Sequence, residues 1–392
     1  MIKKLMLFKH IDICNNCFND ITDLLIDELK KRNIKYEIVD LNKDKESMEA
    51  ELTSKLDDSF DAAISFNTMG QHNIQNCDGE NLFDHYGVPF YNWILDNPVD
   101  LMNTWKSKCK NFYCLCMDKF HVEYIKRNFE HVKDTFFLPL GGVSRPEPLK
   151  SFNEREYDIT FMGRIGSLNK IVQTINSLPD EQKTFIYNLI DYSMDNRSLD
   201  INAVSEAVLK ERLGIEFIEE GNIEFVRCSA SLANIFMREY NRLTVLKSIV
   251  DSKLNFHIFG GDREILGDGM GYTHYHDGVS FSETVNIFRN SKIVLNVMPC
   301  FKNGIHDRIP SGMLNKALVL TDESIYINEL LSDMVIVYDL EEAETLAEKL
   351  SEIISNIEKY QEMVERAYEY ARLNFSWEKT TDRLLSILES CC

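Results

Sequence analysis

The feature that most constrains the fold is an alternation, along almost the whole chain, of short apolar runs with longer amphipathic segments. Near the start, "LMLF" and "KYEIVD" are typical of strands, and they flank "NDITDLLIDELKKR", whose apolar residues recur at helical spacing after an Asn or Asp cap. Strands that are apolar throughout and separated by helices indicate a parallel sheet with both faces covered. The pattern therefore predicts an α/β fold.

The alternation is interrupted once, by "GVSRPEPLKSFNERE", which holds two Pro, several charges and no periodicity. A second series of strands and helices begins after it, so we expect two doubly wound, Rossmann-like domains that face a cleft. The second carries a helical insertion, and the final helix either completes that domain or crosses back onto the first. The predicted ranges are 1–145 for the first domain, 146–156 for the linker, 157–372 for the second domain with its insertion at about 178–230, and 373–392 for the C-terminal helix.

Charge excludes several classes of partner. The 392-residue chain has a formal net charge of −20, and no short window is dominated by Lys and Arg. Phosphate backbones and anionic bilayers both attract basic surfaces, so we expect neither nucleic acid binding nor stable membrane binding. No apolar run approaches the length of a membrane span, which favours a cytoplasmic protein.

The sequence gives little support for a metal site. Cys14 and Cys17 have metal or redox spacing, but only the loosely spaced Cys114 and Cys116 offer a second pair, and ordinary reduced thiols are the favoured interpretation of the ten Cys. No Asp-x-Asp triplet occurs, whereas an enzyme that used Mg²⁺ or Mn²⁺ on a nucleotide sugar would usually need paired carboxylates. We therefore expect no metal and no cofactor.

Candidate binding residues follow the predicted strands of the second domain, because ligands of open α/β sheets bind at the carboxyl ends of strands. In "FMGRIGSLNK", Gly163 stands where a strand turns into a helix, with Arg164 and Lys170 close by. Backbone amides at a helix start and a guanidinium together suit a diphosphate, although Arg164 on a solvated turn is the simpler alternative. Gly260 and Gly261 follow the next strand, "FHIF".

A second cation lies in "HDRIPSGML". Arg308 is expected at the N-terminal edge of a helix that begins near Pro310, where it would also face a ligand with two negative charges. His306 is a candidate hydrogen-bond donor to a phosphate or sugar oxygen, and Asp307 is expected to cap the helix or to hold Arg308. The alternative is a capped helix with a loop ion pair.

These residues resemble a family. The Gly-Arg turn, the "FGG" strand end and "HDRIPSGMLNKALVLTDES" are similar to GT-B fold glycosyltransferases of the group-1 type, most of all to the bacterial branch of CgeB-type spore-maturation and flagellin-modifying enzymes. In the first domain, "VPFYNWILDNPVDL" resembles the Trp-x-x-Asp-x-Pro segment of that branch. The matching residues are Trp93, Asp96, Pro98, Arg308, Met313, Leu314, Asn315, Thr321 and Asp322.

The resemblance implies a nucleotide-sugar site on the second domain, to which Thr321 and Asp322 would contribute, and an acceptor site on the first. Many relatives carry a Glu in the helix after the Arg to hold the ribose, and Ser311 stands there in this chain. Glu323 is a candidate substitute for that Glu. If the reaction inverts the anomeric centre, Asp96 is the candidate general base; His10 and His72 are weaker rivals.

The resulting prediction is a metal-independent glycosyltransferase that moves a sugar from a nucleotide diphosphate donor to a protein or soluble glycan. The expected donor is a UDP-sugar, with N-acetylglucosamine or another hexose as the sugar. Two alternatives stay open: a nucleotide-sugar epimerase or hydrolase on the same fold, and a non-catalytic module that binds a nucleotide sugar or a partner.

Overall fold

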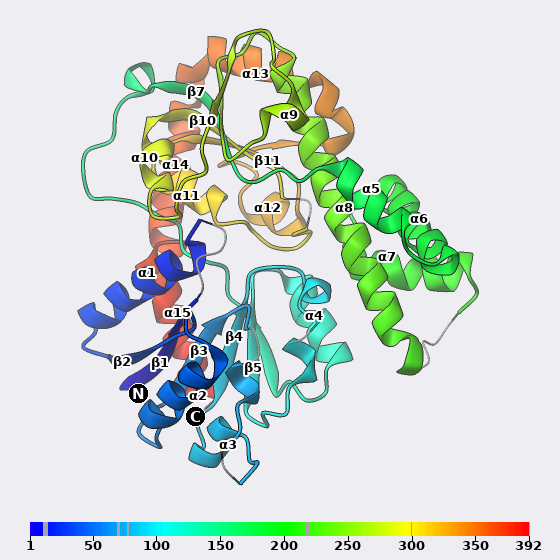
Figure 1. Ribbon diagram of the computed structural model, residues 1–392. Coiled ribbons are helices and arrows are strands. Elements are labelled where there is room, and N and C mark those ends of the chain that lie inside the picture. The colour runs from blue at the N-terminus through cyan, green and yellow to red at the C-terminus, as the bar shows by residue number, and fades with distance from the viewer. Residues whose placement is uncertain are drawn as a thin grey trace. The chain divides into compact units, whose positions relative to one another are not determined.

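The computed structural model describes residues 1–10, 15–68, 71–76, 78–102, 104–215, 220–298 and 300–391. The chain forms two compact units (Figure 1). Unit 1 consists of Met1–Val143, Ser280–Glu283 and Leu373–Cys392, and unit 2 consists of Ser144–Val279 and Thr284–Arg372.

Within the described residues, the sheet of unit 1 has six parallel strands in the order β2-β1-β3-β4-β5-β6. The chain leaves β1 toward one edge and returns to its other side with β3, so the switch point of the sheet lies between these two strands. Every residue of β3, β4 and β5 is buried, which explains why these segments are apolar throughout. The strands are β1 (Lys4–Lys9), β2 (Lys35–Asp40), β3 (Ala62–Phe66), β4 (Phe90–Ile94), β5 (Phe112–Cys116) and β6 (Asp134–Phe137).

Helices connect successive strands of unit 1, as the sequence pattern predicted. Three of them begin at a side-chain cap: Asp44, Asn81 and Asp118 each accept a hydrogen bond from a backbone N–H of the first turn. The helices are α1 (Cys17–Lys31), α2 (Lys45–Lys55), α3 (Leu82–Tyr86) and α4 (Lys119–Asn128).

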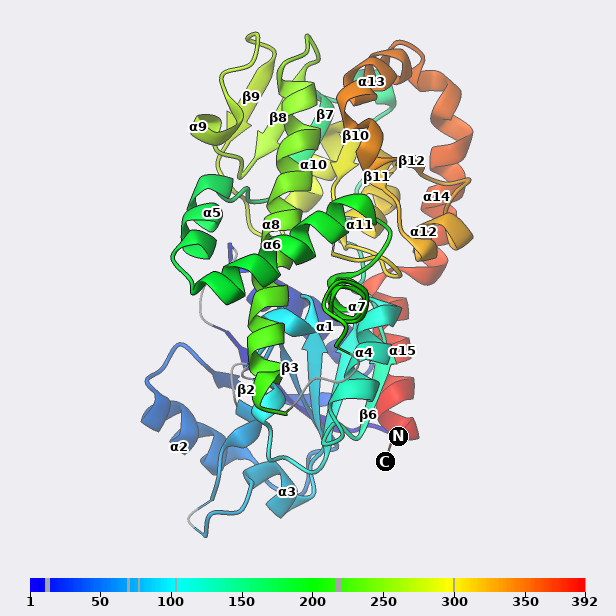
Figure 2. The same cartoon turned by 90° about the vertical axis from the view of Figure 1, so that its right-hand side faces the viewer.

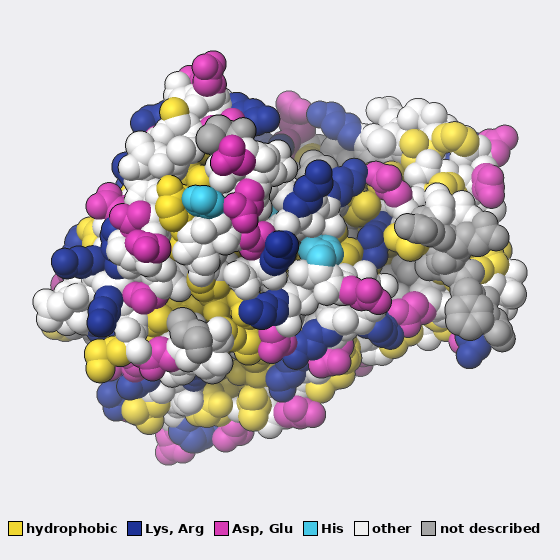
Figure 3. Space-filling view, turned by 90° about the horizontal axis from the view of Figure 1, so that it is seen from below, with side chains coloured by type: hydrophobic (Ala, Val, Ile, Leu, Met, Phe, Trp, Pro, Cys, Tyr) yellow, Lys and Arg dark blue, Asp and Glu magenta, His cyan; other side chains and the backbone are white. Residues whose placement is uncertain are grey.

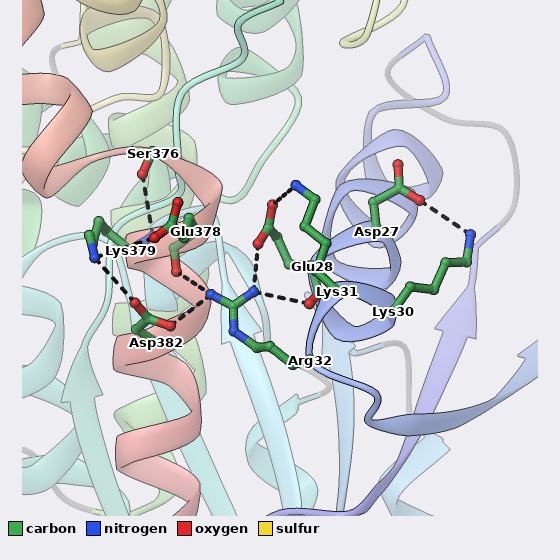
Figure 4. Close-up of polar contacts among 9 residues, drawn as sticks. All are labelled: Asp27, Glu28, Lys30, Lys31, Arg32, Ser376, Glu378, Lys379 and Asp382. Carbon is green, nitrogen blue, oxygen red and sulfur yellow. Dashed lines mark hydrogen bonds and ion pairs between the residues drawn. The ribbon is translucent and has the colours of Figure 1, made fainter.

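The C-terminal helix α15 (Trp377–Ser390) belongs to unit 1, where it lies beside α1 (Figures 1 and 4). Arg32 joins the two helices: its guanidinium contacts the carboxylate of Glu28 at 2.6 Å and that of Asp382 at 2.7 Å. It also donates to the Glu378 carbonyl at 3.0 Å. Of the two placements that the sequence left open for the final helix, the structure therefore shows the return to the first unit.

The sheet of unit 2 also has six parallel strands among the described residues, in the order β12-β11-β10-β7-β8-β9. Here β7 and β10 are neighbours from which the chain proceeds in opposite directions, so the switch point lies between them. The strands are β7 (Tyr157–Met162), β8 (Phe256–Phe259), β9 (Thr273–His276), β10 (Ser291–Asn296), β11 (Leu318–Asp322) and β12 (Ile336–Tyr338).

The predicted helical insertion consists of α6, α7 and a π-helical turn at Val208–Arg212, and it leads into α8. This 28-residue helix is continuous from the insertion to the core, where Val245, Leu246, Ile249 and Val250 pack against the sheet. Helices α5, α6 and α7 pack along it (Figure 2). The helices of unit 2 are α5 (Leu168–Asn176), α6 (Asp180–Asp195), α7 (Ile201–Ala207), α8 (Ile223–Val250), α9 (Arg263–Leu266), α10 (Thr284–Asn290), α11 (Arg308–Leu314), α12 (Ile325–Leu330), α13 (Leu346–Ser355) and α14 (Gln361–Asn374).

The predicted α/β fold with two doubly wound sheets is thus confirmed. None of the described helices is both long enough and apolar enough to cross a membrane. On the face drawn in Figure 3, basic and acidic side chains are interspersed and form no stripe of one sign.

Candidate functional site

The polar groups of unit 2 meet at the switch point of its sheet, beyond the carboxyl ends of β7 and β10. Arg308, the first residue of α11, donates from Nη1 to the Oδ1 of Asn296 at 2.9 Å, and its guanidinium lies 5.6 Å from the centre of the Phe161 ring. A Cβ atom on Gly163 would stand 3.0 Å from the Nη2 of Arg308. Glycine at 163 therefore makes room for the guanidinium beside the end of β7.

Asn296 fixes the orientation of this guanidinium. Its Nδ2 donates to the Oγ1 of Thr321 at 3.0 Å, which leaves Oδ1 to accept from Arg308, and its backbone carbonyl accepts from the hydroxyl of Tyr338 at 2.9 Å. Asn296 and Thr321 are both fully buried. Thr321, which the sequence predicted as a binding residue, is therefore placed behind the site, where it orients Asn296.

Asp322 is also fully buried, at the end of β11. Its Oδ1 accepts from the backbone N–H of Met298 at 2.7 Å, whereas its Oδ2 has no hydrogen-bond partner among the described residues. Burial raises the pKa of this carboxyl to about 6, although the charges of Lys302 and Arg242 oppose the rise. The carboxylate thus lies under the site, within electrostatic reach of two cations.

His306 and Asp307 form a pair just before α11, with 2.8 Å between Nδ1 and Oδ1. Burial and the charge of Arg308 lower the pKa of His306 against the opposing effect of Asp307, so the ring is neutral near pH 7. Burial raises the pKa of Asp307, but the contacts with His306 and Arg308 more than offset this, and the net shift is downward.

Nδ1 of His306 lies between two groups: the carboxylate of Asp307 at 2.8 Å and the backbone N–H of Arg308, which donates to it at 3.3 Å. A neutral imidazole carries one N–H donor and one acceptor, so the neutral ring is compatible with the role of donor that the sequence analysis gave to His306. Asp307 occupies the position before the helix, but its side chain makes no cap hydrogen bond, so its role is to hold His306.

The two glycines after β8 are required by the backbone. Gly260 has φ +86°, and a Cβ atom on it would stand 3.4 Å from the carbonyl oxygen of Gly163. A Cβ atom on Gly261 would collide with the Cγ2 of Ile258 at 2.3 Å. Gly260 thus lies beside Gly163 at the end of β7, and Gly261 leaves room for the side chain of Ile258 in β8.

The loop after β7 is held by α8, through two residues that the sequence analysis missed. Glu239, 4% exposed, accepts from the backbone N–H of Gly166 at 2.6 Å. Arg242 donates from Nη1 to the carbonyl of Arg164 at 3.2 Å. The available signal was a pair of opposite charges three residues apart, on the side of the amphipathic helix that also carries Leu246 and Ile249.

Two of the predicted cations extend toward solvent. The side chains of Arg164 and Lys170 are exposed, and Lys170 forms no side-chain hydrogen bond or ion pair within the described part of the chain. The Lys170 backbone N–H bonds to Ser167, which caps α5. The structure therefore brings Gly163 and Arg308 together, but does not bring Lys170 to them.

The two candidates for holding a ribose differ in exposure. Ser311 is fully buried in α11, where the neighbouring Gly312 lies so close to β11 that an added Cβ atom would stand 2.7 Å from Val319. Glu323 is exposed just past β11, and its Oε2 accepts from Asn328 at 3.4 Å. Of the two, Glu323 is the one that solvent reaches.

In unit 1, Asp96 is exposed just past the end of β4. Its Oδ2 accepts from the Nδ2 of Asn67 at 2.7 Å, and the Oδ1 of Asn67 accepts from the N–H of Leu95 at 2.8 Å. The turn at Pro98 is capped by Asn97, which accepts from the N–H of Val99. Because Asn97 caps that turn, the carboxylate of Asp96 is available to solvent.

The other two candidates of unit 1 are interior residues. His10 is 1% exposed, with Nε2 3.4 Å from the Oγ of Ser65, and burial lowers its pKa to about 4. His72 is fully buried against the ring of Phe112, and burial lowers its pKa to about 4 as well. Neither imidazole is exposed to an acceptor substrate in this arrangement.

Within the described residues, no group of three His, Cys, Asp or Glu side chains is arranged to hold a metal ion. The described Cys side chains are free thiols. Cys114 and Cys116 are fully buried in β5, where burial raises the pKa of both thiols. Cys14, the first member of the predicted Cys pair, lies outside the described residues.

Comparison with known proteins places this site in context. Residues 238–386, less than half of the chain, match the family model described as "Glycosyl transferase-like". That segment contains Arg242, Arg308 and the strands β8 to β12. No curated protein is significantly similar to the chain in sequence.

Several solved structures share the fold. A glycosyltransferase from Rickettsia africae has a TM-score of 0.54 at 10% identity, over 100% of this chain and 98% of its own. HepE from Anabaena, in complex with UDP and glucose, has a TM-score of 0.55 at 9% identity, over 99% of this chain and 100% of its own. An α-glucosyltransferase in complex with UDP and a 13-mer DNA has a TM-score of 0.57 at 11% identity, over 99% and 100% of the two chains.

At these identities the neighbours show the fold, which is the predicted GT-B fold. The family match and the fold together support a glycosyltransferase.

Proposed function

We propose that the protein is a metal-independent glycosyltransferase that binds a nucleotide diphosphate sugar on unit 2 and transfers the sugar to a hydroxyl of a protein or soluble glycan. The observation that carries this proposal is the guanidinium of Arg308, oriented by Asn296 at the switch point of the sheet. A cation fixed at that point suits a diphosphate, whose charge grows as the bond to the sugar breaks.

The donor is proposed to be a UDP-sugar, with a hexose or N-acetylglucosamine as the transferred group. Two of the compared structures, HepE and the α-glucosyltransferase, contain UDP. Their low identity to this chain gives only indirect support for the same nucleotide. The CgeB-like branch, with a protein as the acceptor, is the finer form of the proposal, and it rests on the "HDRIPSGMLNKALVLTDES" segment.

The proposed mechanism assigns stabilisation of the leaving group to unit 2. Arg308 is proposed to donate to a phosphate oxygen through the side of its guanidinium that faces Gly163. His306, held by Asp307, is proposed to form a hydrogen bond with the sugar or a phosphate oxygen. Arg308 is proposed to perform the charge stabilisation that a divalent cation provides in other transferases.

Unit 1 is proposed to supply the acceptor chemistry. If transfer inverts the anomeric centre, the exposed carboxylate of Asp96 removes the proton of the acceptor hydroxyl. If transfer retains the configuration, no such base is needed and Asp96 only binds the acceptor. Asn67 holds the carboxylate in one orientation in either case.

The test is calorimetric titration of the purified protein with UDP, GDP and their common sugar conjugates, in the presence and absence of EDTA. We expect one nucleotide to bind, with an affinity that EDTA does not change and that Arg308→Ala removes. Loss of binding or turnover in EDTA, restored by Mn²⁺, would contradict metal independence. Failure of every nucleotide to bind the wild-type protein would refute the proposed function itself.

A non-catalytic module that binds a nucleotide sugar is the second candidate. The observation that favours it is the absence of a carboxylate at position 311, where Ser311 is buried and does not reach solvent. Such a module would bind the donor without hydrolysis or transfer. An epimerase on the same fold would instead convert the sugar without any acceptor, so product analysis of the incubated donor separates the three functions.

A further inference from the structure

We propose that Arg242, on α8, binds the diphosphate of the donor together with Arg308, in the place that the sequence assigned to Lys170. This inference rests on the proposed function and names a further binding residue for it. Arg242 lies at the C-terminal half of the long helix, in the segment that enters the core of unit 2.

The contacts of Arg242 place its guanidinium at the loop after β7. Nη1 donates to the carbonyl of Arg164, the residue that follows Gly163, and the side chain is 13% exposed. Nε has no hydrogen-bond partner among the described residues. Because a guanidinium has five N–H donors and only this carbonyl bond is formed, Arg242 retains unused donors at a partly exposed position.

Electrostatic effects show which groups surround this guanidinium. Its charge acts on the pKa of both His306 and Asp322, so Arg242 lies within reach of the residues on either side of α11. Arg308 also acts on His306. The two guanidiniums therefore both lower the pKa of one imidazole, Arg242 from the helix α8 and Arg308 from α11.

The carboxylates near Arg242 neutralise it only in part. Glu239 forms a long ion pair with Nη1 of Arg242, at 4.0 Å, but lies 3.0 Å from Nε of Arg238, and its second oxygen accepts from Gly166. The Oδ2 of Asp322 has no hydrogen-bond partner in the described residues, so it forms no hydrogen-bonded pair with Arg242 either. Positive charges thus outnumber negative ones around Arg242, which favours an anionic ligand: the cations are Arg238, Arg242, Lys302 and Arg308, and the carboxylates are Glu239, Asp307 and Asp322.

The exposure of Lys170 argues against a role for its side chain in binding the diphosphate. Its side chain is exposed on α5, whereas Arg242 is mostly buried and directed at the loop. A mostly buried guanidinium loses less side-chain entropy on binding a phosphate than an exposed lysine does, and it offers two parallel donors in place of a point charge. Arg242 is therefore better arranged for the diphosphate than Lys170.

The experiment measures the affinity of the full-length protein for UDP and for UMP by calorimetry, with GDP and GMP as the pair if the wild type prefers guanine. For Arg242→Ala we expect UDP to bind about 10- to 100-fold more weakly, and UMP to lose clearly less, because UMP lacks the second phosphate. Lys247→Ala, an exposed cation on the same helix, is the matched control and should bind both as the wild type does. Lys170→Ala should change the UDP affinity less than Arg242→Ala.

Three results would overturn the inference while leaving the proposed function intact. The first is that Arg242→Ala binds UDP as tightly as the wild type does. The second is that Arg242→Ala loses affinity for UMP and for UDP by the same factor. The third is that Lys170→Ala loses more UDP affinity than Arg242→Ala does. An equal loss for both nucleotides would mean that Arg242 only supports the loop through the Arg164 carbonyl. If thermal unfolding shows that Arg242→Ala does not fold, Arg242→Lys is used, and it should recover part of the UDP preference if charge is what the site needs. A wild-type protein that binds no nucleotide would refute the proposed function instead.

Discussion

At the switch point of unit 1 the described residues that directly follow β1 and β3, His10 and Asn67, are neutral, whereas at the switch point of unit 2 a guanidinium lies across the ends of β7 and β10. Both sheets have parallel strands that close on an apolar core. Burial lowers the pKa of His10 and of His72 to about 4, so both are neutral near pH 7. The guanidinium of Arg308 is held in place by the Oδ1 of Asn296, which accepts from it, and by the Phe161 ring 5.6 Å away.

The two units share one architecture but differ in the charge of these residues. The architecture therefore determines where a binding site lies, and the side chains determine which ligand it suits. Unit 2 offers fixed cations, which suit a diphosphate. Unit 1 offers neutral polar groups and, just past the end of β4, the exposed carboxylate of Asp96, which suit a neutral acceptor with hydroxyl groups. The following experiments test this division, from the largest expected effect to the smallest.

The largest expected effect is on turnover, and together with nucleotide affinity it distinguishes the role of Arg308 from that of Asp96. Arg308→Ala should lower both nucleotide affinity and turnover, the latter by roughly 10²- to 10³-fold, since a donor to the leaving group is lost. Asp96→Asn should lower turnover by roughly 10²- to 10⁴-fold if transfer inverts, and leave the calorimetric affinity for UDP unchanged. An equal loss of UDP affinity in both variants would break the division between the units.

The second effect concerns acid stability in unit 1. The pKa of His10 in the folded protein, about 4, is below its unfolded value of about 6.5, so His10 stabilises the fold above pH 6.5 and this contribution is lost as the pH falls toward 4. The loss amounts to about 3 kcal/mol of unfolding free energy. His10→Gln should therefore flatten the pH dependence measured by urea denaturation between pH 7 and pH 4.5. His85→Gln, at an exposed site, is the control, and an unchanged slope in His10→Gln would contradict the assignment.

In unit 2 the expected pH effect of Asp322 has the opposite sign. The folded pKa of about 6 lies above the ordinary pKa of an aspartate, 3.8, so its contribution to stability is present at low pH and declines as the pH rises from about 4 to about 6. The decline is about 2 to 3 kcal/mol at most. The unfolding free energy of Asp322→Asn should thus rise relative to that of the wild type over this range. A difference between the two proteins that stays constant with pH would show that the carboxyl titrates normally.

The smallest effect concerns the contact between α1 and α15 within unit 1. Arg32→Ala should lower the unfolding free energy by about 1 kcal/mol, because it removes one partner of the nearly buried carboxylate of Glu28 and the bond to Asp382. Figure 4 shows the matched control beside it: Lys30→Ala removes an exposed pair with Asp27 and should have no measurable effect. Equal melting temperatures for the two variants would mean that Arg32 adds no stability to this contact.

Much of this arrangement was predictable from local pattern. Apolar strands followed by glycine and by cations were enough to predict the α/β fold and to select Gly163 and Arg308, because the carboxyl ends of parallel strands meet at one edge. The contact between these two residues was not predictable in detail, since it joins segments that are far apart in the chain and depends on the orientation that Asn296 gives to the guanidinium.

Other features depend on tertiary packing and have no local signature. Helical periodicity indicated α8 but not that Glu239 and Arg242 would point at the loop after β7. The burial of Thr321 and Asp322 follows from the strands on either side of β11, which the local sequence does not reveal. The placement of α15 was left open because both domains present apolar helix faces.

The continuity of α8 has a consequence for engineering the chain. At 1.5 Å per residue this helix is about 40 Å long, and it connects the outermost part of the insertion to Arg242 and Glu239 without a loop between them. A surface insertion is usually removable by joining the ends of the segment that it interrupts. In this chain, removing the whole insertion would cut α8, and the C-terminal part of that helix packs against the sheet. The insertion can therefore be shortened at α6 and α7 but not removed.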